Sequence, residues 1–241
     1  MSNGKGFDRY SRLQTKIGMM ILDGKRDGDD VADVLQVVLG KEEFKSILLK
    51  KSDAPKGAEP VTDWFAEMAK FYKDVFGMDL DMSQVALSAD PGGFGWALFV
   101  AQGITLNQVW AKCKQRFPSS FSVYGDDLDK AVTENDRNTA VGYVKRFRDR
   151  VEADKENKNI SASTLKQNGA QSITLLERLL LELWYHWKTG KHLDIQNWTL
   201  CAGSRDRDGS VPYVYWRDLG LRVGGCPPGA ARGAVRARSA V

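Results

Sequence analysis

The pattern of apolar and polar positions changes style near residue 89 of this chain. Before that point, apolar residues recur at helical spacing, as in Leu13, Ile17 and Ile21. Residues 64–76 carry a wide apolar stripe that ends at Gly77, which predicts a further helix. Residues 50–61 hold two prolines and several charges, a composition typical of an exposed loop. We therefore predict a helical domain over residues 1–88, with an exposed loop near residues 50–61.

The remainder of the chain mixes strand-like and helical patterns. Residues 96–101 form an apolar run of strand length, and residues 105–117 have helical spacing. The strongest pattern starts after Ser172 or Thr174, either of which suits the N-cap of a helix that runs to about Thr189. The apolar side of this helix is broad, so we expect it to be buried on more than one side.

Short strand-like segments separated by glycine turns follow this helix, at residues 198–201, 211–216 and 221–223. Pro212 has no backbone N–H and therefore indicates an edge or irregular strand. We expect the helix to pack under antiparallel strands in a mixed α/β domain over residues 89–241. The predicted fold class of the whole chain is α+β.

Composition sets the C-terminal segment, residues 202–241, apart from the rest of the chain. It contains no Met, Glu, Lys or Gln, and its seven Arg against three Asp give +4, which equals the formal charge of the whole chain. Two explanations suit such a segment: a basic low-complexity tail, or a surface drawn from a restricted set of codons. Codons of the type NNC encode Ser, Tyr, Arg, Asp, Gly, Cys, Pro, Ala, Val and Leu, but not Lys, Glu, Gln, Met or Trp.

Several functional classes are disfavoured by the sequence. The three cysteines are widely spaced and there are only two histidines, so we expect neither a structural zinc site nor another metal site. No nucleophile elbow, phosphate loop or dinucleotide fingerprint is present, which argues against an enzyme and predicts no cofactor. No apolar run reaches signal-peptide or membrane-spanning length. These features predict a cytoplasmic protein without a membrane partner and leave the oligomeric state open.

Binding chemistry concentrates in the C-terminal segment. Tyr gives a large amphipathic contact area at low entropy cost, Ser adapts, and Arg is a favoured hot-spot residue. We expect Trp216, the one residue of the segment outside the restricted codon set, to lie in the core. The candidate ligand-binding residues are Asp206, Arg207, Ser210, Tyr213, Tyr215, Arg217, Asp218 and Arg222.

The chain resembles a group of uncharacterised proteins from candidate-phylum bacteria over residues 89–241. The resemblance rests on RDRVEAD at residues 148–154, ITLLERLLLEL at 173–183, TGKHLD at 189–194, LCAGSR at 200–205, the Val-Pro-x-Val-x-Trp stretch at 211–216 and VRARSAV at 235–241. Such proteins are similar to variable proteins diversified by retroelements, whose variable region resembles a C-type lectin fold. The chain departs from that pattern at Leu219-Gly220 and across the Gly-, Ala- and Pro-rich residues 224–234.

The resemblance implies a C-type-lectin-like domain over residues 89–241 with a variable region at about 202–235. It also implies a function, a variable module that displays a binding surface to an unknown protein or other macromolecule. Fixed residues would support that surface. The scaffold residues that match are Gly203, Ser204, Trp216, Arg236 and Arg238.

The alternative is a nucleic-acid-binding protein with a basic, partly disordered C-terminal tail. Arg232, Arg236 and Arg238 would then contact phosphates, and Tyr213, Tyr215 and Trp216 would be available for stacking on bases. An enzyme or a purely structural protein without a recognisable motif is a third reading.

Overall fold

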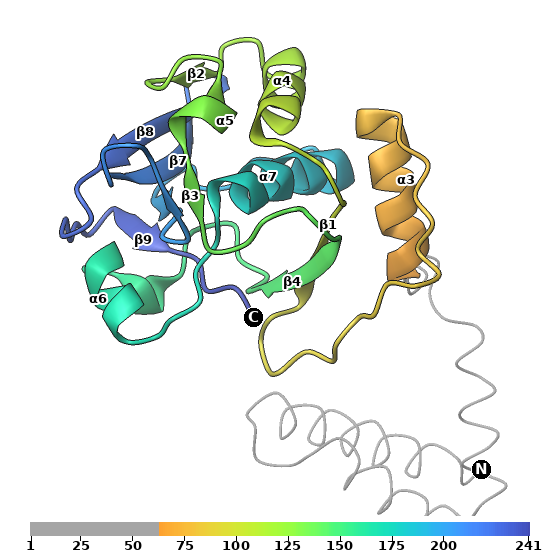
Figure 1. Cartoon of the computed structure of the whole chain (residues 1–241), viewed down its shortest axis with the longest axis horizontal. Coiled ribbons are helices and arrows are strands. Elements are labelled where there is room, and N and C mark those ends of the chain that lie inside the picture. Colours follow the sequence, from red (N-terminus) through yellow and green to blue (C-terminus); the bar gives the residue numbers. More distant parts are fainter. Residues whose placement is uncertain (1–62) are drawn as a thin grey trace, which may run out of the picture. The chain divides into compact units, whose positions relative to one another are not determined.

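The computed structural model describes residues 63–241, and the chain divides into two compact units between Val61 and Thr62. The helices predicted before residue 62 and the loop predicted near residues 50–61 lie outside the described residues. The second unit is a mixed α/β structure built around one five-stranded sheet and one long central helix (Figure 1).

The large sheet has the strand order β2-β8-β7-β5-β9. Its strands are β2 (Phe121–Ser122), β8 (Gly220–Cys226), β7 (Val211–Arg217), β5 (Trp198–Leu200) and β9 (Val235–Ala237). β7 runs antiparallel to β8 and β5, whereas β2 is parallel to β8 and β9 is parallel to β5.

The strands expected after residue 198 are present, but one detail was wrong. β7 lies between β8 and β5, so Pro212 occupies a central strand and does not mark an edge. The carbonyl of Pro212 still accepts the N–H of Cys201 at 2.8 Å. The strand therefore loses only the hydrogen bond that the missing N–H of the proline would have donated.

Two small antiparallel sheets complete the strands. β1 (Trp96–Val100) pairs with β4 (Tyr143–Phe147), and β3 (Glu134–Asn135) pairs with β6 (Ser204–Arg205). β1 is the apolar run predicted as a strand, and it is buried over nearly its whole length.

The described helices are α3 (Trp64–Phe76), α4 (Leu106–Arg116), α5 (Leu128–Ala131), α6 (Ala162–Gln167) and α7 (Leu175–Thr189), with a 3-10 turn at Lys155–Asn157. Capping explains the bounds of α7. Thr174 and Glu177 form a capping box at its start, and Gly190 ends it with φ 69°. The predicted extent of this helix is confirmed.

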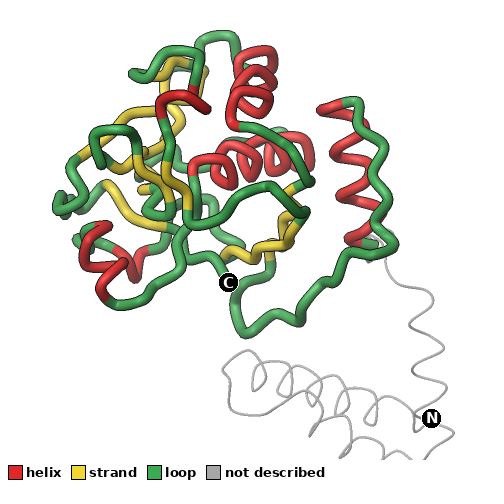
Figure 2. The backbone as a smooth tube through the Cα atoms, viewed as in Figure 1, coloured by secondary structure: helices red, strands yellow, loops and turns green. Residues whose placement is uncertain are grey.

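α7 organises the core of this unit. It lies between the large sheet on one side and helices α3 and α4 on the other (Figures 1 and 2). The sheet contributes Val214, Leu221 and Val223 to the shared core cluster, and all three are buried. The expectation that this helix packs under short strands is therefore confirmed.

α3 belongs to the same core, which corrects the predicted domain boundary. Its residues Met68, Phe71 and Tyr72 are fully buried, and the Tyr72 hydroxyl donates to the carbonyl of Phe99 at 2.8 Å. The boundary predicted between residues 88 and 89 therefore falls inside one compact unit, which begins at Thr62. The aromatic stripe of α3 predicted a helix correctly, but it did not indicate which part of the chain this helix packs against.

Candidate binding face

The pairing of β7 with β8 fixes which candidate residues share a side of the sheet. Tyr213 lies opposite Gly224, Tyr215 opposite Arg222, and Arg217 opposite Gly220. Paired side chains point to the same side of a sheet, and successive side chains alternate.

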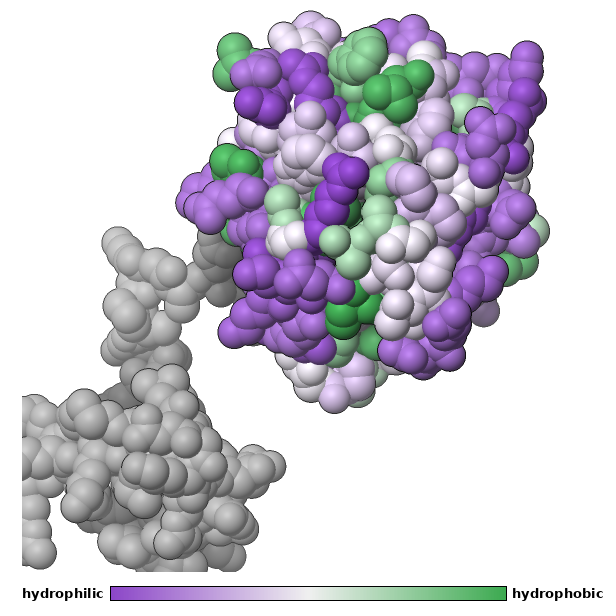
Figure 3. All heavy atoms as spheres, turned by 90° about the vertical axis from the view of Figure 1, so that its left-hand side faces the viewer, coloured by the Kyte–Doolittle hydropathy of each residue, from purple (hydrophilic) through white to green (hydrophobic). Residues whose placement is uncertain are grey.

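Because Val214, Leu221 and Val223 point into the core with α7, the other side of β7 and β8 faces away from that helix. It carries what we call the tyrosine face, which consists of Tyr213, Tyr215, Arg217 and Arg222. α6 covers one end of this side, where it packs on Val211. The view onto the left-hand side of Figure 1 shows a pale band of intermediate hydropathy between strongly hydrophilic side chains (Figure 3).

An aromatic stack lies on the same side. Continuing the register of β5 with β7 places Trp198 opposite Tyr215. The Trp198 ring is 4.4 Å from that of Tyr215 at 14° and 5.0 Å from that of Tyr213 at 25°. All three side chains are half-buried, so part of each ring reaches solvent. Sequence analysis did not include Trp198, because the residue precedes the C-terminal segment and only the register brings it to the tyrosines.

Tyr213 also needs the glycine beside it. A Cβ atom at Gly224 would lie 2.4 Å from the Tyr213 hydroxyl oxygen, so the ring rests directly on the β8 backbone. Burial raises the pKa of the Tyr213 hydroxyl, with a smaller contribution from Tyr215. The hydroxyl is therefore protonated at neutral pH and available as a hydrogen-bond donor.

The β7–β8 hairpin is closed by a two-residue turn with unusual residues at its centre. Asp218 and Leu219 have φ values of 51° and 61°, the left-handed region that a side chain disfavours. Asp218 lies 3.9 Å from Arg217 and 3.8 Å from Arg222, and Asp218 and Arg217 are largely exposed. Such long, exposed ion pairs stabilise little. Arg222 also donates to the carbonyl of Ser119, which fixes its guanidinium against the β2 end of the sheet.

The remaining candidates do not join the tyrosine face. Asp206, Arg207 and Ser210 lie in the turn between β6 and β7, where the N–H of Arg207 bonds the carbonyl of Ala131 at the end of α5. The Asp206 carboxylate accepts the N–H of Ser210 at 2.8 Å and that of Asp208 at 3.0 Å. This residue therefore shapes its own turn, as aspartates commonly do. Of the eight candidate residues, the structure therefore brings four together on the tyrosine face, with Asp218 at its rim.

The expectation that Trp216 lies in the core is met in part. The residue packs against the core on the α7 side of the sheet and is half-buried. Its ring is stacked on His192 at 3.3 Å and 9°, and meets Phe117 edge-on at 5.1 Å. Because it points away from Tyr213 and Tyr215, the three rings do not form the joint stacking surface that the nucleic-acid alternative assumed.

Two scaffold candidates hold the start of α7. A Cβ atom at Gly203 would lie 2.7 Å from the carbonyl oxygen of Ser172, so no larger residue fits there. The Ser204 hydroxyl accepts the N–H of Leu175 at 2.9 Å and donates to Asn135 at 2.6 Å. It thereby satisfies a free N–H in the first turn of the central helix.

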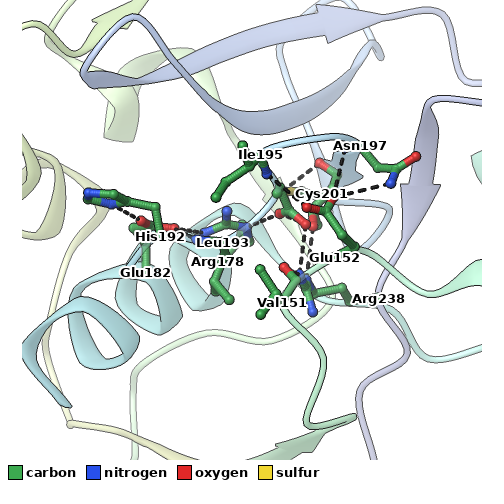
Figure 4. A network of polar contacts seen from close by, with 12 residues as sticks. Val151, Glu152, Arg178, Glu182, His192, Leu193, Ile195, Asn197, Cys201 and Arg238 are labelled. Atoms are coloured by element: carbon green, nitrogen blue, oxygen red, sulfur yellow. Dashed lines mark hydrogen bonds and ion pairs between the residues drawn. The ribbon is translucent and has the colours of Figure 1, made fainter. Parts of the chain in front are cut away.

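The two terminal arginines have different roles. Arg238 is buried and pairs with Asp194 at 2.7 Å, while it donates to the carbonyl of Val151 and the hydroxyl of Thr199 (Figure 4). Asp194 in turn pairs with the fully buried Arg178 at 2.8 Å. Arg236, by contrast, is half-buried and bonds only its neighbouring carbonyl of Gly233 among the described contacts.

This network contradicts the picture of a basic, partly disordered tail. Val235–Ala237 is a strand of the large sheet, and Arg238 is enclosed by protein, so it is not available to a phosphate. Among the three arginines of that alternative, Arg232 remains exposed.

The remaining observations concern metal ligands, thiols and membrane-spanning helices in the part of the chain that the structure describes. Over residues 63–241 no three His, Cys, Asp or Glu side chains come together as a metal site. Cys113, Cys201 and Cys226 are free and buried, and burial raises the pKa of each thiol. The helices of this range are too short or too polar to cross a bilayer.

Comparisons with protein-family models, with curated proteins and with solved structures gave no match. The class of the protein therefore rests on its own geometry: a mixed α/β unit that presents, on one side of its sheet, two tyrosines stacked on a tryptophan and two arginines.

Proposed function

We propose that the chain is a variable ligand-binding module, the target protein of a diversity-generating retroelement, with a C-type-lectin-like domain that binds a protein or other macromolecule. The observation that carries this proposal is the separation of roles inside the C-terminal segment. The tyrosine face points outward, whereas Gly203, Ser204 and Arg238 of the same segment are buried structural residues.

That separation is what a diversified binder needs. Exposed positions tolerate exchange, since surface substitutions usually change stability by about 0.5 kcal/mol or less. Tyr and Arg at such positions supply contact area and hot-spot chemistry. The restricted alphabet of residues 202–241, which lacks Lys, Glu, Gln and Met, agrees with replacement at adenines of a common codon type.

The nucleic-acid alternative is less well supported than the display module. Its phosphate contacts would need Arg238, which is occupied by Asp194, and its stacking surface would need Trp216, which lies on the other side of the sheet. The tyrosine face is the better candidate, and we take its ligand to be a protein.

The proposal is tested by a folding screen of matched positions. Each of Arg217, Arg238, Ser204 and Ser210 is randomised in the full chain, displayed on yeast and sorted for protease resistance. We expect most exchanges to survive at Arg217 and Ser210 and few to survive at Arg238 and Ser204, because only the latter pair is buried and hydrogen-bonded. Equal intolerance at all four positions would remove the distinction between display surface and scaffold.

The surrounding DNA tests the diversification itself. We expect a near-identical copy of the sequence that encodes residues 202–235, differing at adenine positions and lying beside a reverse-transcriptase gene. If the neighbouring genome contains neither, the retroelement part of the proposal is wrong, whereas the binding face can still be tested by mutation.

A further inference from the structure

The tyrosine face continues beyond the C-terminal segment onto β2. Phe121 pairs with Arg222 in a parallel ladder, so its side chain points to the same side of the sheet. It is 59% exposed, which is unusual for a phenylalanine in a strand, and nearby Val123 is 61% exposed. Figure 3 shows strongly hydrophobic atoms at the upper end of this view, and β2 lies at that end of the molecule in Figure 1.

One row of side chains therefore crosses four strands. Phe121 on β2 is followed by Arg222 on β8, Tyr215 on β7 and Trp198 on β5. The row has an exposed aromatic ring at one end, an aromatic stack at the other and a guanidinium between them. Two of its four members, Phe121 and Trp198, lie outside the segment in which variation is proposed.

The position of β2 is fixed by contacts to the hairpin. The Ser120 hydroxyl accepts the N–H of Leu221 at 3.1 Å, and Arg222 donates to the carbonyl of Ser119. A Cβ atom at Gly220 would lie 2.5 Å from the Ser119 carbonyl carbon, so the two backbones are in direct contact. The bond to Ser120 comes from the backbone N–H of Leu221, so it holds Phe121 next to the hairpin independently of the side chain at position 222, provided that residue 220 is Gly.

The charge around the row is positive. Arg217 is largely exposed, Arg222 lies within the row, and Arg232 is exposed. The acidic side chain at the hairpin is Asp218, which is shared between Arg217 and Arg222. With seven Arg against three Asp, the C-terminal segment carries the excess charge of the chain. The surface that complements this row therefore carries apolar side chains opposite the aromatic rings and carboxylates next to them, opposite the arginines.

We infer that Phe121 is a constant apolar anchor of the binding face and that the partner is a protein segment in which apolar side chains are flanked by Asp or Glu. This inference rests on the proposed function. The anchor supplies contact energy common to all variants, while Tyr213, Tyr215 and Arg217 supply selectivity. Buried aromatic anchors surrounded by polar contacts are the usual arrangement of binding hot spots.

The test uses two peptide libraries displayed on phage and panned against the full chain. One library is built from Asp, Glu, Leu, Phe, Ser and Gly, and the other has Lys and Arg in place of Asp and Glu. We expect enrichment from the acidic library alone. Enriched peptides are then synthesised and titrated against Phe121→Ser, Tyr215→Ser and Val141→Ser, the last being a control at another exposed apolar residue.

Phe121→Ser and Tyr215→Ser should each weaken binding about tenfold or more, the size expected for a hot-spot residue, and Val141→Ser should leave it within about twofold. Circular dichroism on each variant shows that the fold is retained. If Tyr215→Ser weakens binding and Phe121→Ser does not, the anchor is wrong and the proposed function stands. If neither weakens binding, the proposed face itself is wrong.

Two further outcomes would overturn the assigned partner chemistry. Enrichment from the basic library, or from neither library, contradicts an acidic partner. A single-stranded oligonucleotide that competes with the enriched peptides, with an affinity that falls steeply as salt rises, would assign the face to nucleic acid instead.

Discussion

Replacing Arg238 by Met tests the buried charge network directly, and Arg236→Met is its matched control. Both arginines lie at the same end of the chain, two residues apart, and the tail alternative gave them the same role. The structure separates them, because Arg238 is 1% exposed and Arg236 is half-buried.

The expected magnitude follows from the charges that remain. The network holds Arg178 and Arg238 against Asp194 and Glu182, all essentially buried, so the four formal charges sum to zero. Removing Arg238 leaves one uncompensated negative charge and takes the guanidinium donor from the carbonyl of Val151. Met keeps most of the volume, so the loss is mainly electrostatic. Breaking a buried pair in this way costs about 3–5 kcal/mol.

Arg236→Met removes one hydrogen bond, from the guanidinium to the carbonyl of Gly233. A hydrogen bond of this kind contributes about 0.5–1.5 kcal/mol. Urea unfolding followed by tryptophan fluorescence measures both variants, because all seven tryptophans lie between Trp64 and Trp216 and so report on the unit described. For a typical urea slope, the larger loss moves the midpoint by about 1–3 M.

The comparison has a clear failing result. If Arg238→Met and Arg236→Met lower the free energy of unfolding equally, and by less than about 1 kcal/mol, Arg238 is not enclosed and the scaffold assignment is wrong. An Arg238→Met chain that is recovered only unfolded agrees with the prediction, provided that Arg236→Met folds.

Three other predictions concern the hairpin and the thiols. Gly224→Ala should lower the free energy of unfolding by about 1–3 kcal/mol, because the added methyl group overpacks against Tyr213. In a double-mutant cycle followed by urea unfolding, Tyr213→Ser should recover most of that loss. If the two effects are additive, the residues do not interact and the reasoning is wrong. Leu219→Gly should stabilise by about 0.5–1 kcal/mol, since it relieves a left-handed backbone at some entropic cost, whereas Leu219→Ala should give no such gain in the same assay. Cys113 and Cys201 should react with an aromatic disulfide reagent at pH 8 only as fast as the protein unfolds, because both thiols are buried and burial raises their pKa. Reaction within seconds in native buffer would contradict their placement.

Features set by short-range chemistry were predictable from the sequence. The N-cap at Thr174 and the stop at Gly190 follow from residues next to the helix ends, and the structure has both. The strands β7 and β8 follow from alternation and turn glycines. The shared side of Tyr213 and Tyr215 followed from the same alternation, because residues two apart in a strand point to the same side of the sheet.

Features set by long-range pairing were not predictable. β2 has two residues, and its partner β8 lies about a hundred positions further along the chain, so no local pattern joins Phe121 to Arg222. Alternation likewise places Arg236 and Arg238 on the same side of their strand. What distinguishes them is Asp194, which comes from the loop after α7 and reaches only Arg238. The predicted domain boundary was wrong for the same reason, because α3 packs against α7, which lies far along the chain.

Under the proposed diversification, the position of β9 decides which variants can fold. β9 and Arg238 follow the proposed variable positions in the sequence, yet they provide the strand beside β5 and the buried partner of Asp194. Loss or gain of a single nucleotide upstream of them would shift the reading frame and replace both at once. The sheet would then lose the strand beside β5, and Asp194 would lose a buried positive partner. Folding therefore acts as a check on the reading frame, and only copies that kept their frame would present a binding face.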